Sequence, residues 1–142
     1  MPRRALESID QEECLALLAQ QRVGRLVFVD ADGPAALPVI YAMADGEIVF
    51  RSEGGSKITA IQDGPVAFEV DEVDHETHAG WSVLVRGESR EVELEALPSL
   101  VRLFENGAPL PWKKGIHRIW VAITPQIVTG RRLADYAEED FS

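Results

Sequence analysis

The chain contains one cysteine, Cys14, and its 14 lysine and arginine residues are outnumbered by 24 aspartate and glutamate residues. A single cysteine excludes an intramolecular disulfide, so we expect a cytoplasmic protein. A formal net charge of −10 disfavours nucleic acid and membrane surfaces as partners, because both attract basic proteins. The apolar runs are too short to span a bilayer, and the start Met1-Pro2-Arg3-Arg4 lacks the apolar segment of a signal peptide.

Catalytic and metal-binding patterns are also scarce. His75 and His78 lie in a polar stretch that offers no third ligand, whereas a catalytic zinc ion takes three, so we predict no metal site. No Ser-His-Asp order and no catalytic carboxylate pair stands out, and we therefore assign no catalytic residue. The length fits one domain, residues 1–142, with an acidic tail from about residue 134.

What the sequence does contain is a series of short strands separated by turn residues. Alternating apolar and polar residues predict six strands, at residues 25–29, 35–44, 47–51, 65–73, 81–94 and 116–128. A helix is expected from Asp10, its N-cap, to about Gln21, and shorter helices at 56–62 and 96–104. Without crossover helices between successive strands, this pattern predicts a mainly β fold built as an antiparallel barrel.

Three local signals refine this prediction. Asp45-Gly46 is typical of a two-residue hairpin turn, because both residues tolerate positive φ. Pro38 indicates a bulge or an edge position, since proline cannot donate to the strand ladder. Gly87, near the middle of a long strand, indicates a bend or bulge.

The segment Arg51-Ser52-Glu53-Gly54-Gly55-Ser56-Lys57 is the most unusual stretch chemically. It places two cations, two hydroxyls and two glycines where a strand turns into a short helix, which is what a bound phosphate requires. It does not match a nucleotide-hydrolysing P-loop, because Lys57 follows serine rather than glycine. An ordinary surface turn, with Ser56 capping the helix, explains the same residues.

Several segments together resemble the pyridoxamine 5′-phosphate oxidase-like proteins, the flavin-binding split-barrel family. The similar segments span roughly residues 11–132 and are Leu37-Pro38-Val39-Ile40-Tyr41, the run from Asp45 to Ser52, Gly55-Ser56-Lys57, Gly80-Trp81-Ser82-Val83, Thr124-Pro125 and Val128-Thr129-Gly130-Arg131-Arg132. The resemblance implies a six-stranded antiparallel split β-barrel that forms a homodimer, with FMN bound at the dimer interface.

The resemblance also implies which residues contact the cofactor. The flavin phosphate would be held by Arg51, Ser52, Ser56 and Lys57. The isoalloxazine ring would lie along Pro38, Val39, Ile40 and Tyr41, and a further ring or ribityl contact would come from Trp81 and Ser82.

The activity implied is that of an FMN-dependent oxidoreductase with a small-molecule substrate. The vitamin B6 oxidases of this family are longer and carry basic residues for the substrate phosphate near their C-terminus. Arg131 and Arg132 lie near that end, but a solvated terminus explains them, so we do not expect pyridoxamine phosphate as the substrate. The alternatives are a deazaflavin-dependent reductase and a non-enzymatic flavin- or haem-binding protein on the same barrel.

Overall fold

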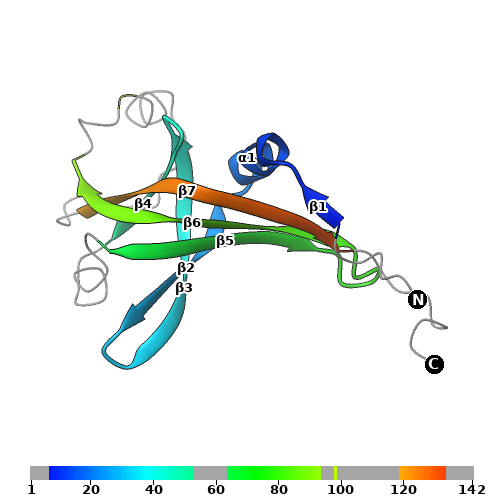
Figure 1. Ribbon diagram of the computed structural model, residues 1–142, viewed down its shortest axis with the longest axis horizontal. Coiled ribbons are helices and arrows are strands. Elements are labelled where there is room, and N and C mark those ends of the chain that lie inside the picture. The colour runs from blue at the N-terminus through cyan, green and yellow to red at the C-terminus, as the bar shows by residue number, and fades with distance from the viewer. Residues whose placement is uncertain (1–6, 53–63, 94–97, 99–118, 134–142) are drawn as a thin grey trace.

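The computed structural model describes residues 7–52, 64–93, 98 and 119–133, and this part of the chain is mainly β, as predicted (Figure 1). The elements in chain order are β1 (Glu7–Ile9), α1 (Gln11–Gln20), β2 (Val23–Asp30), β3 (Gly33–Ala44), β4 (Glu47–Ser52), β5 (Pro65–Val73), β6 (Gly80–Val92) and β7 (Ile119–Leu133).

The strands form one antiparallel sheet that closes on itself. Their order is β1-β7-β4-β3-β2-β5-β6, and an additional pairing of β6 with β7 joins the two sides into a ring. The 15-residue strand β7 makes this closure possible, because its first part pairs with β4 while its whole length from Trp120 pairs with β6. In Figure 1, β5, β6 and β7 run side by side and the β2–β3 hairpin projects away from them. The predicted antiparallel barrel is therefore confirmed.

The local predictions mostly hold within the described residues. Asp45 and Gly46 have φ values of 52° and 79°, as the predicted hairpin turn requires. The register of β6 with β7 shifts between Arg86 and Gly87, so the predicted bulge at Gly87 is confirmed. Pro38 pairs regularly with Arg25, so the alternative of a bulge is wrong. In this half of β3 the only described partner strand is β2, so the alternative of an edge position is confirmed.

Three predictions differ from the structure or fall outside it. The strand β1 is absent from the prediction, so the described part of the chain has seven strands rather than six. β7 continues through Pro125 and extends to Leu133, beyond its predicted end at residue 128. The helices expected at 56–62 and 96–104 lie outside the described residues, apart from the single position 98.

Two buried clusters lie on opposite faces of the same strands. The larger cluster fills the barrel and includes Leu18, Leu26, Ile48, Phe50, Phe68, Val83, Val85 and Ile123. The smaller cluster consists of Ala44, Val49, Trp120 and Ala122 on β3, β4 and β7. Because side chains alternate along a strand, these two clusters define an inner and an outer face for every strand they include.

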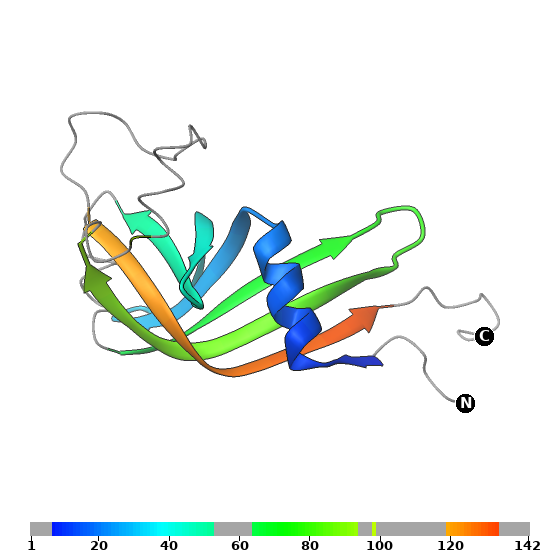
Figure 2. The same ribbon diagram turned by 90° about the horizontal axis from the view of Figure 1, so that it is seen from above.

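Helix α1 lies across the strands and is fastened to the inner face (Figure 2). Asp10 caps it by accepting a 2.8 Å hydrogen bond from the backbone N–H of Glu13, as predicted. The side chains of Cys14 and Leu18 are fully buried, so Cys14 is a core residue. The Tyr41 hydroxyl donates a 2.5 Å hydrogen bond to the carbonyl oxygen of Leu18, and burial raises the pKa of that hydroxyl. The helix contains too few residues to cross a membrane, and it is the one multi-residue helix in the described part of the chain.

Candidate functional site

The predicted phosphate cation, Arg51, and the predicted ring contact Ile40 share the outer face of the barrel. Tyr41 pairs with Phe50 between β3 and β4, and both of these side chains are buried inside. The next position on each strand points to the opposite face, and continuing the register places Ile40 across from Arg51. Ile40 is 51% exposed, whereas the Nε and Nη1 atoms of Arg51 are buried.

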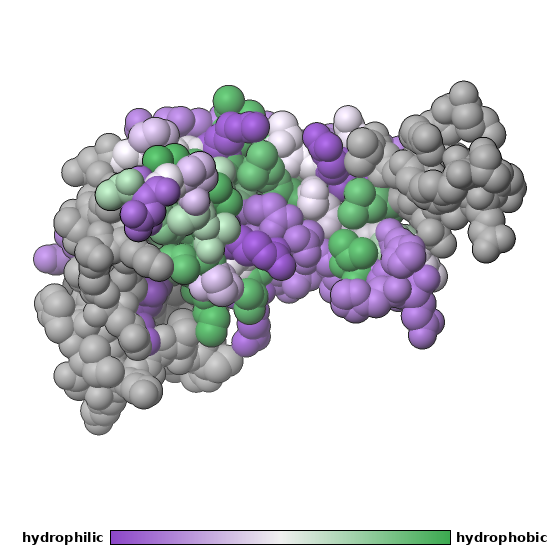
Figure 3. Space-filling view, turned by 90° about the horizontal axis from the view of Figure 1, so that it is seen from below, coloured by the Kyte–Doolittle hydropathy of each residue, from purple (hydrophilic) through white to green (hydrophobic). Residues whose placement is uncertain are grey.

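An apolar strip, interrupted by Arg25, extends from Ile40 along the outer face of the β2–β3 hairpin. Val23 pairs directly with Ile40 and is 58% exposed, so two facing aliphatic side chains are open to solvent. Further along the hairpin, Val29 pairs with Pro34 and both are exposed. Figure 3 shows hydrophobic residues beside hydrophilic ones on the side of the molecule from which this hairpin projects. A cationic group therefore stands at one end of an exposed apolar strip.

The pleat of the strands divides the predicted ring contacts between the two faces. Pro38 and Ile40 lie outside, whereas Val39 packs against the core and Tyr41 is part of it. Trp81 is likewise a core residue and only 7% exposed. Its neighbour Ser82 lies on the outer face. Pro38, Ile40, Arg51 and Ser82 all lie on the outer face, although β2 and β5 separate the strand of Ser82 from that of Pro38 and Ile40.

The remaining predicted phosphate contacts lie at or beyond the end of β4. Ser52 is its last residue and pairs with Ile119 through the backbone. Ser56 and Lys57 lie outside the described residues. The assignment of these three residues to the phosphate stays a prediction.

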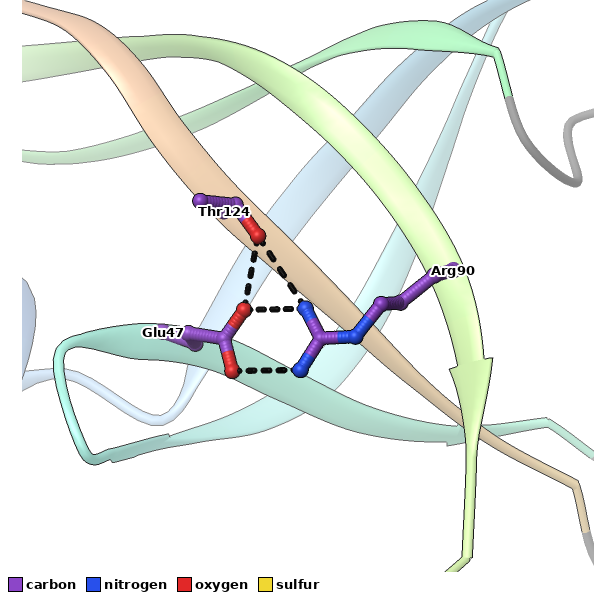
Figure 4. A network of polar contacts seen from close by, with 3 residues as sticks. All are labelled: Glu47, Arg90 and Thr124. Atoms are coloured by element: carbon purple, nitrogen blue, oxygen red, sulfur yellow. Dashed lines mark hydrogen bonds and ion pairs between the residues drawn. The ribbon is translucent and has the colours of Figure 1, made fainter.

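The strand that carries Arg51 is held in place by a polar network on the same face (Figure 4). Arg90 on β6 donates to both carboxylate oxygens of Glu47 on β4, and its Nη2 lies 2.8 Å from Glu47 Oε1. The Thr124 hydroxyl on β7 donates a 2.7 Å hydrogen bond to the same carboxylate. The hydrogen bond from Arg90, with a smaller contribution from Thr124, lowers the pKa of Glu47 against the opposing effect of partial burial. Three strands are thereby cross-linked beside the buried cluster next to Arg51.

A second polar group on the outer face has no counterpart in the sequence prediction. Arg25 on β2 donates from Nη1 to Glu69 Oε1 at 2.8 Å and to Asp71 Oδ2 at 2.9 Å, both on β5. Desolvation and the neighbouring Asp71 carboxyl raise the pKa of Glu69 to about 7. We call Arg25, Glu69 and Asp71 the outer triad. Glu69 and Asp71 lie 44 and 46 positions after Arg25 in the sequence, so only the pairing of β2 with β5 reveals the outer triad.

The described residues contain no cluster suited to a metal ion. No group of three or more histidine, cysteine, aspartate or glutamate side chains is arranged to hold one in the parts of the chain that the structure describes. His75 and His78 are both exposed in the β5–β6 connection. The chemistry that the outer face does offer is a guanidinium group for an anion and an apolar strip for a flat ligand.

At the level of sequence, the chain matches a family model and a known protein. The model of the pyridoxamine 5′-phosphate oxidase family matches residues 10–132. The protein Rv0080 of Mycobacterium tuberculosis, which is described as uncharacterised, is 34% identical over 137 residues, or 92% of this chain and 87% of that protein.

At the level of the fold, the chain is similar to solved structures of proteins named for FAD binding. The FAD binding protein of Mycobacterium smegmatis has a TM-score of 0.76 and 30% identity, and the match covers 92% of this chain and 100% of that one. An FAD-binding protein of Mesorhizobium loti has a TM-score of 0.72 and 24% identity, covering 91% and 99% of the two chains, which supports the fold alone.

Proposed function

Because the chain belongs to the pyridoxamine 5′-phosphate oxidase family, we propose that it binds a flavin nucleotide on the outer face of the barrel and acts as a flavin-dependent oxidoreductase. The observation that carries this proposal is the position of Arg51 beside the exposed pair Val23 and Ile40. The 30% identical FAD binding protein of M. smegmatis supports the same class of ligand.

The residues present suit the two ends of a flavin. A phosphate is best bound by a guanidinium group that donates charge-assisted hydrogen bonds, and two nitrogen atoms of Arg51 are already shielded from water. A flat aromatic ring suits exposed aliphatic side chains with a few polar groups beside them. Pro38 and Ile40 provide the apolar surface, and Ser82 provides a hydroxyl on the same face.

The geometry of the site suits both FMN and FAD. The sequence resemblance favours FMN, whereas the M. smegmatis protein is named for FAD. Both molecules present the same ring system and the same first phosphate, so Arg51 serves either one. We favour FMN and leave the choice to a direct titration.

A homodimer is part of the proposal, since the described residues include apolar side chains that are exposed on the outer face. Val29 and Ile127 lie on this face and are 68% and 54% exposed. Burying such side chains against a second copy would contribute about 25 cal/mol per Å² of apolar surface. A two-fold interface would place the same face of both copies around the cofactor.

The bound flavin would supply hydride or electron transfer, while the protein supplies binding and orientation. Arg51 would hold the phosphate and fix one end of the cofactor. The β2–β3 strip would exclude water from one side of the ring. A catalytic side chain is not needed for this division of labour, and we assign none; the substrate is a small molecule of unassigned structure.

The test is a titration of the purified protein with FMN and with FAD, followed by flavin fluorescence and by the absorbance of the complex. We expect saturation at one flavin per chain and a dimer by sedimentation. Turnover with NAD(P)H or reduced deazaflavin then separates an enzyme from a carrier, because a carrier would bind flavin without turnover. Binding of neither flavin would refute the proposal.

A further inference from the structure

The outer triad lies on the two strands between the proposed cofactor contacts. Asp71 on β5 pairs with Ser82 on β6, and Arg25 on β2 pairs with Pro38 on β3. Neighbouring strands are about 4.8 Å apart, so β6 and β3 are separated by about 14 Å across β5 and β2. A flavin that touches both Ser82 and Pro38 of one chain must therefore lie over the triad.

The triad carries more negative charge than its single cation can balance. One nitrogen atom, Arg25 Nη1, serves both carboxylates, and the group has a net charge of −1 when both are ionised. The Glu69 and Asp71 side chains are already only 26% and 31% exposed. Two other charged residues lie near this group on the same face. Arg86 on β6 pairs with Ala67, one same-face position from Glu69, and Arg131 on β7 pairs with Ser82, one strand beyond β6.

Covering the triad would make the second negative charge more costly. Removing water disfavours an ionised carboxyl, and a like charge beside it disfavours ionisation further. Glu69 can instead take up one proton, which leaves the triad neutral. Desolvation and the neighbouring Asp71 carboxyl already raise the pKa of Glu69 to about 7, so protonation of this side chain needs little further free energy.

We propose that Glu69 and Asp71 are ligand-facing carboxyls of the same site, and that flavin binding drives the uptake of one proton by Glu69. This inference rests on the proposed function and deepens it. The proton comes from solvent, and no bond other than its own is made or broken. The bound site then presents a neutral triad to the ligand, because Arg25 balances the one carboxylate charge that remains.

Calorimetric titration measures this proton directly. The protein is titrated with FMN at pH 8 in two buffers of different ionisation enthalpy, and the difference in apparent binding enthalpy gives the protons taken up. At this pH the flavin phosphate is already fully ionised, since its second pKa is about 6, so it contributes no proton of its own. We expect uptake approaching one proton per flavin, and a Kd that rises by up to about tenfold per pH unit above pH 8.

The variant Glu69→Gln separates the triad from other proton sources. It keeps the shape of the side chain and should abolish the uptake and flatten the pH dependence of Kd, and Asp71→Asn should do the same. The control is Glu72→Gln, on the same strand but outside the triad, which should keep the wild-type uptake. Thermal melts confirm that each variant is folded.

The outcomes distinguish the two proposals. Failure of the wild-type protein to bind any flavin would overturn both. Flavin binding without proton uptake, or uptake that persists in both Glu69→Gln and Asp71→Asn, would overturn this inference and leave the proposed function standing.

Discussion

Replacing Gly130 with alanine should push helix α1 away from the barrel. Gly130 lies on β7, between Ile9 on β1 and Val83 on β6 in the register. A Cβ atom at this position would lie 2.5 Å from the Cys14 sulfur, whereas ordinary contact begins at 3.4 Å, so about 0.9 Å of separation is missing. Both neighbouring strands hold the backbone, and Cys14 is fully buried, so neither side yields easily.

The expected cost follows from this clash. Overpacking of a buried site costs about 1–3 kcal/mol in unfolding free energy, which corresponds to roughly 4 °C in Tm per kcal/mol for a domain of this size. The variant Cys14→Ala removes the sulfur and its weak hydrogen bond to the Ile9 carbonyl oxygen, at a cost of about 1 kcal/mol. In the double variant, the new methyl group enters the space that the sulfur leaves.

Chemical denaturation of the wild type, both single variants and the double variant tests this reasoning. The loss of unfolding free energy in the double variant should be about 1–2 kcal/mol smaller than the sum of the losses in the two single variants. Gly24→Ala is a matched control, because its Cβ meets the Phe68 ring at 2.4 Å and Cys14→Ala should not relieve that clash. Simple additivity of Gly130→Ala and Cys14→Ala would refute the packing argument.

Three further predictions concern single side chains. Tyr41→Phe keeps the ring but removes the hydrogen bond to Leu18, so urea denaturation should show a loss of about 1 kcal/mol; no loss would mean that this bond does not fasten α1. Glu47→Gln should lower the unfolding free energy at pH 7 by about 1 kcal/mol. The folded-state pKa of Glu47 is lowered, so the wild type loses this stability on protonation and the difference should disappear as the pH falls below the ordinary carboxyl value of 4.5. A difference that does not depend on pH would exclude the ion pair as its cause. The raised pKa of Glu69 predicts the opposite trend: its contribution to stability is complete below pH 4.5 and is lost as the pH rises through about 7, and Glu69→Gln should remove this slope from melts recorded between pH 5 and pH 8.

Local sequence signals predict most of the barrel because they depend on neighbouring residues. The alternation in β5, the Asp45-Gly46 turn and the Asp10 cap are all settled within a few positions. β1 escapes prediction because it has only three residues and exists through its pairing with β7, more than 100 positions away.

The candidate site is only partly predictable for the same physical reason. The sequence resemblance marks Pro38–Tyr41 as a continuous ring contact, but the pleat sends Val39 and Tyr41 into the core. Trp81 and Ser82 are separated in the same way, since adjacent residues on a strand face opposite sides. The outer triad depends on the long-range pairing of β2 with β5, which no local pattern contains.

The most direct test of a flavin site centred on Arg51 compares FMN with riboflavin, which lacks the phosphate, in the wild type and in Arg51→Ala. A charge-assisted hydrogen bond is worth about 1.5–3 kcal/mol, so the variant should bind FMN roughly 10- to 100-fold more weakly and bind riboflavin as the wild type does. Equal affinity of both proteins for FMN, or an equal loss for both ligands, would contradict the assignment of Arg51 to the flavin phosphate.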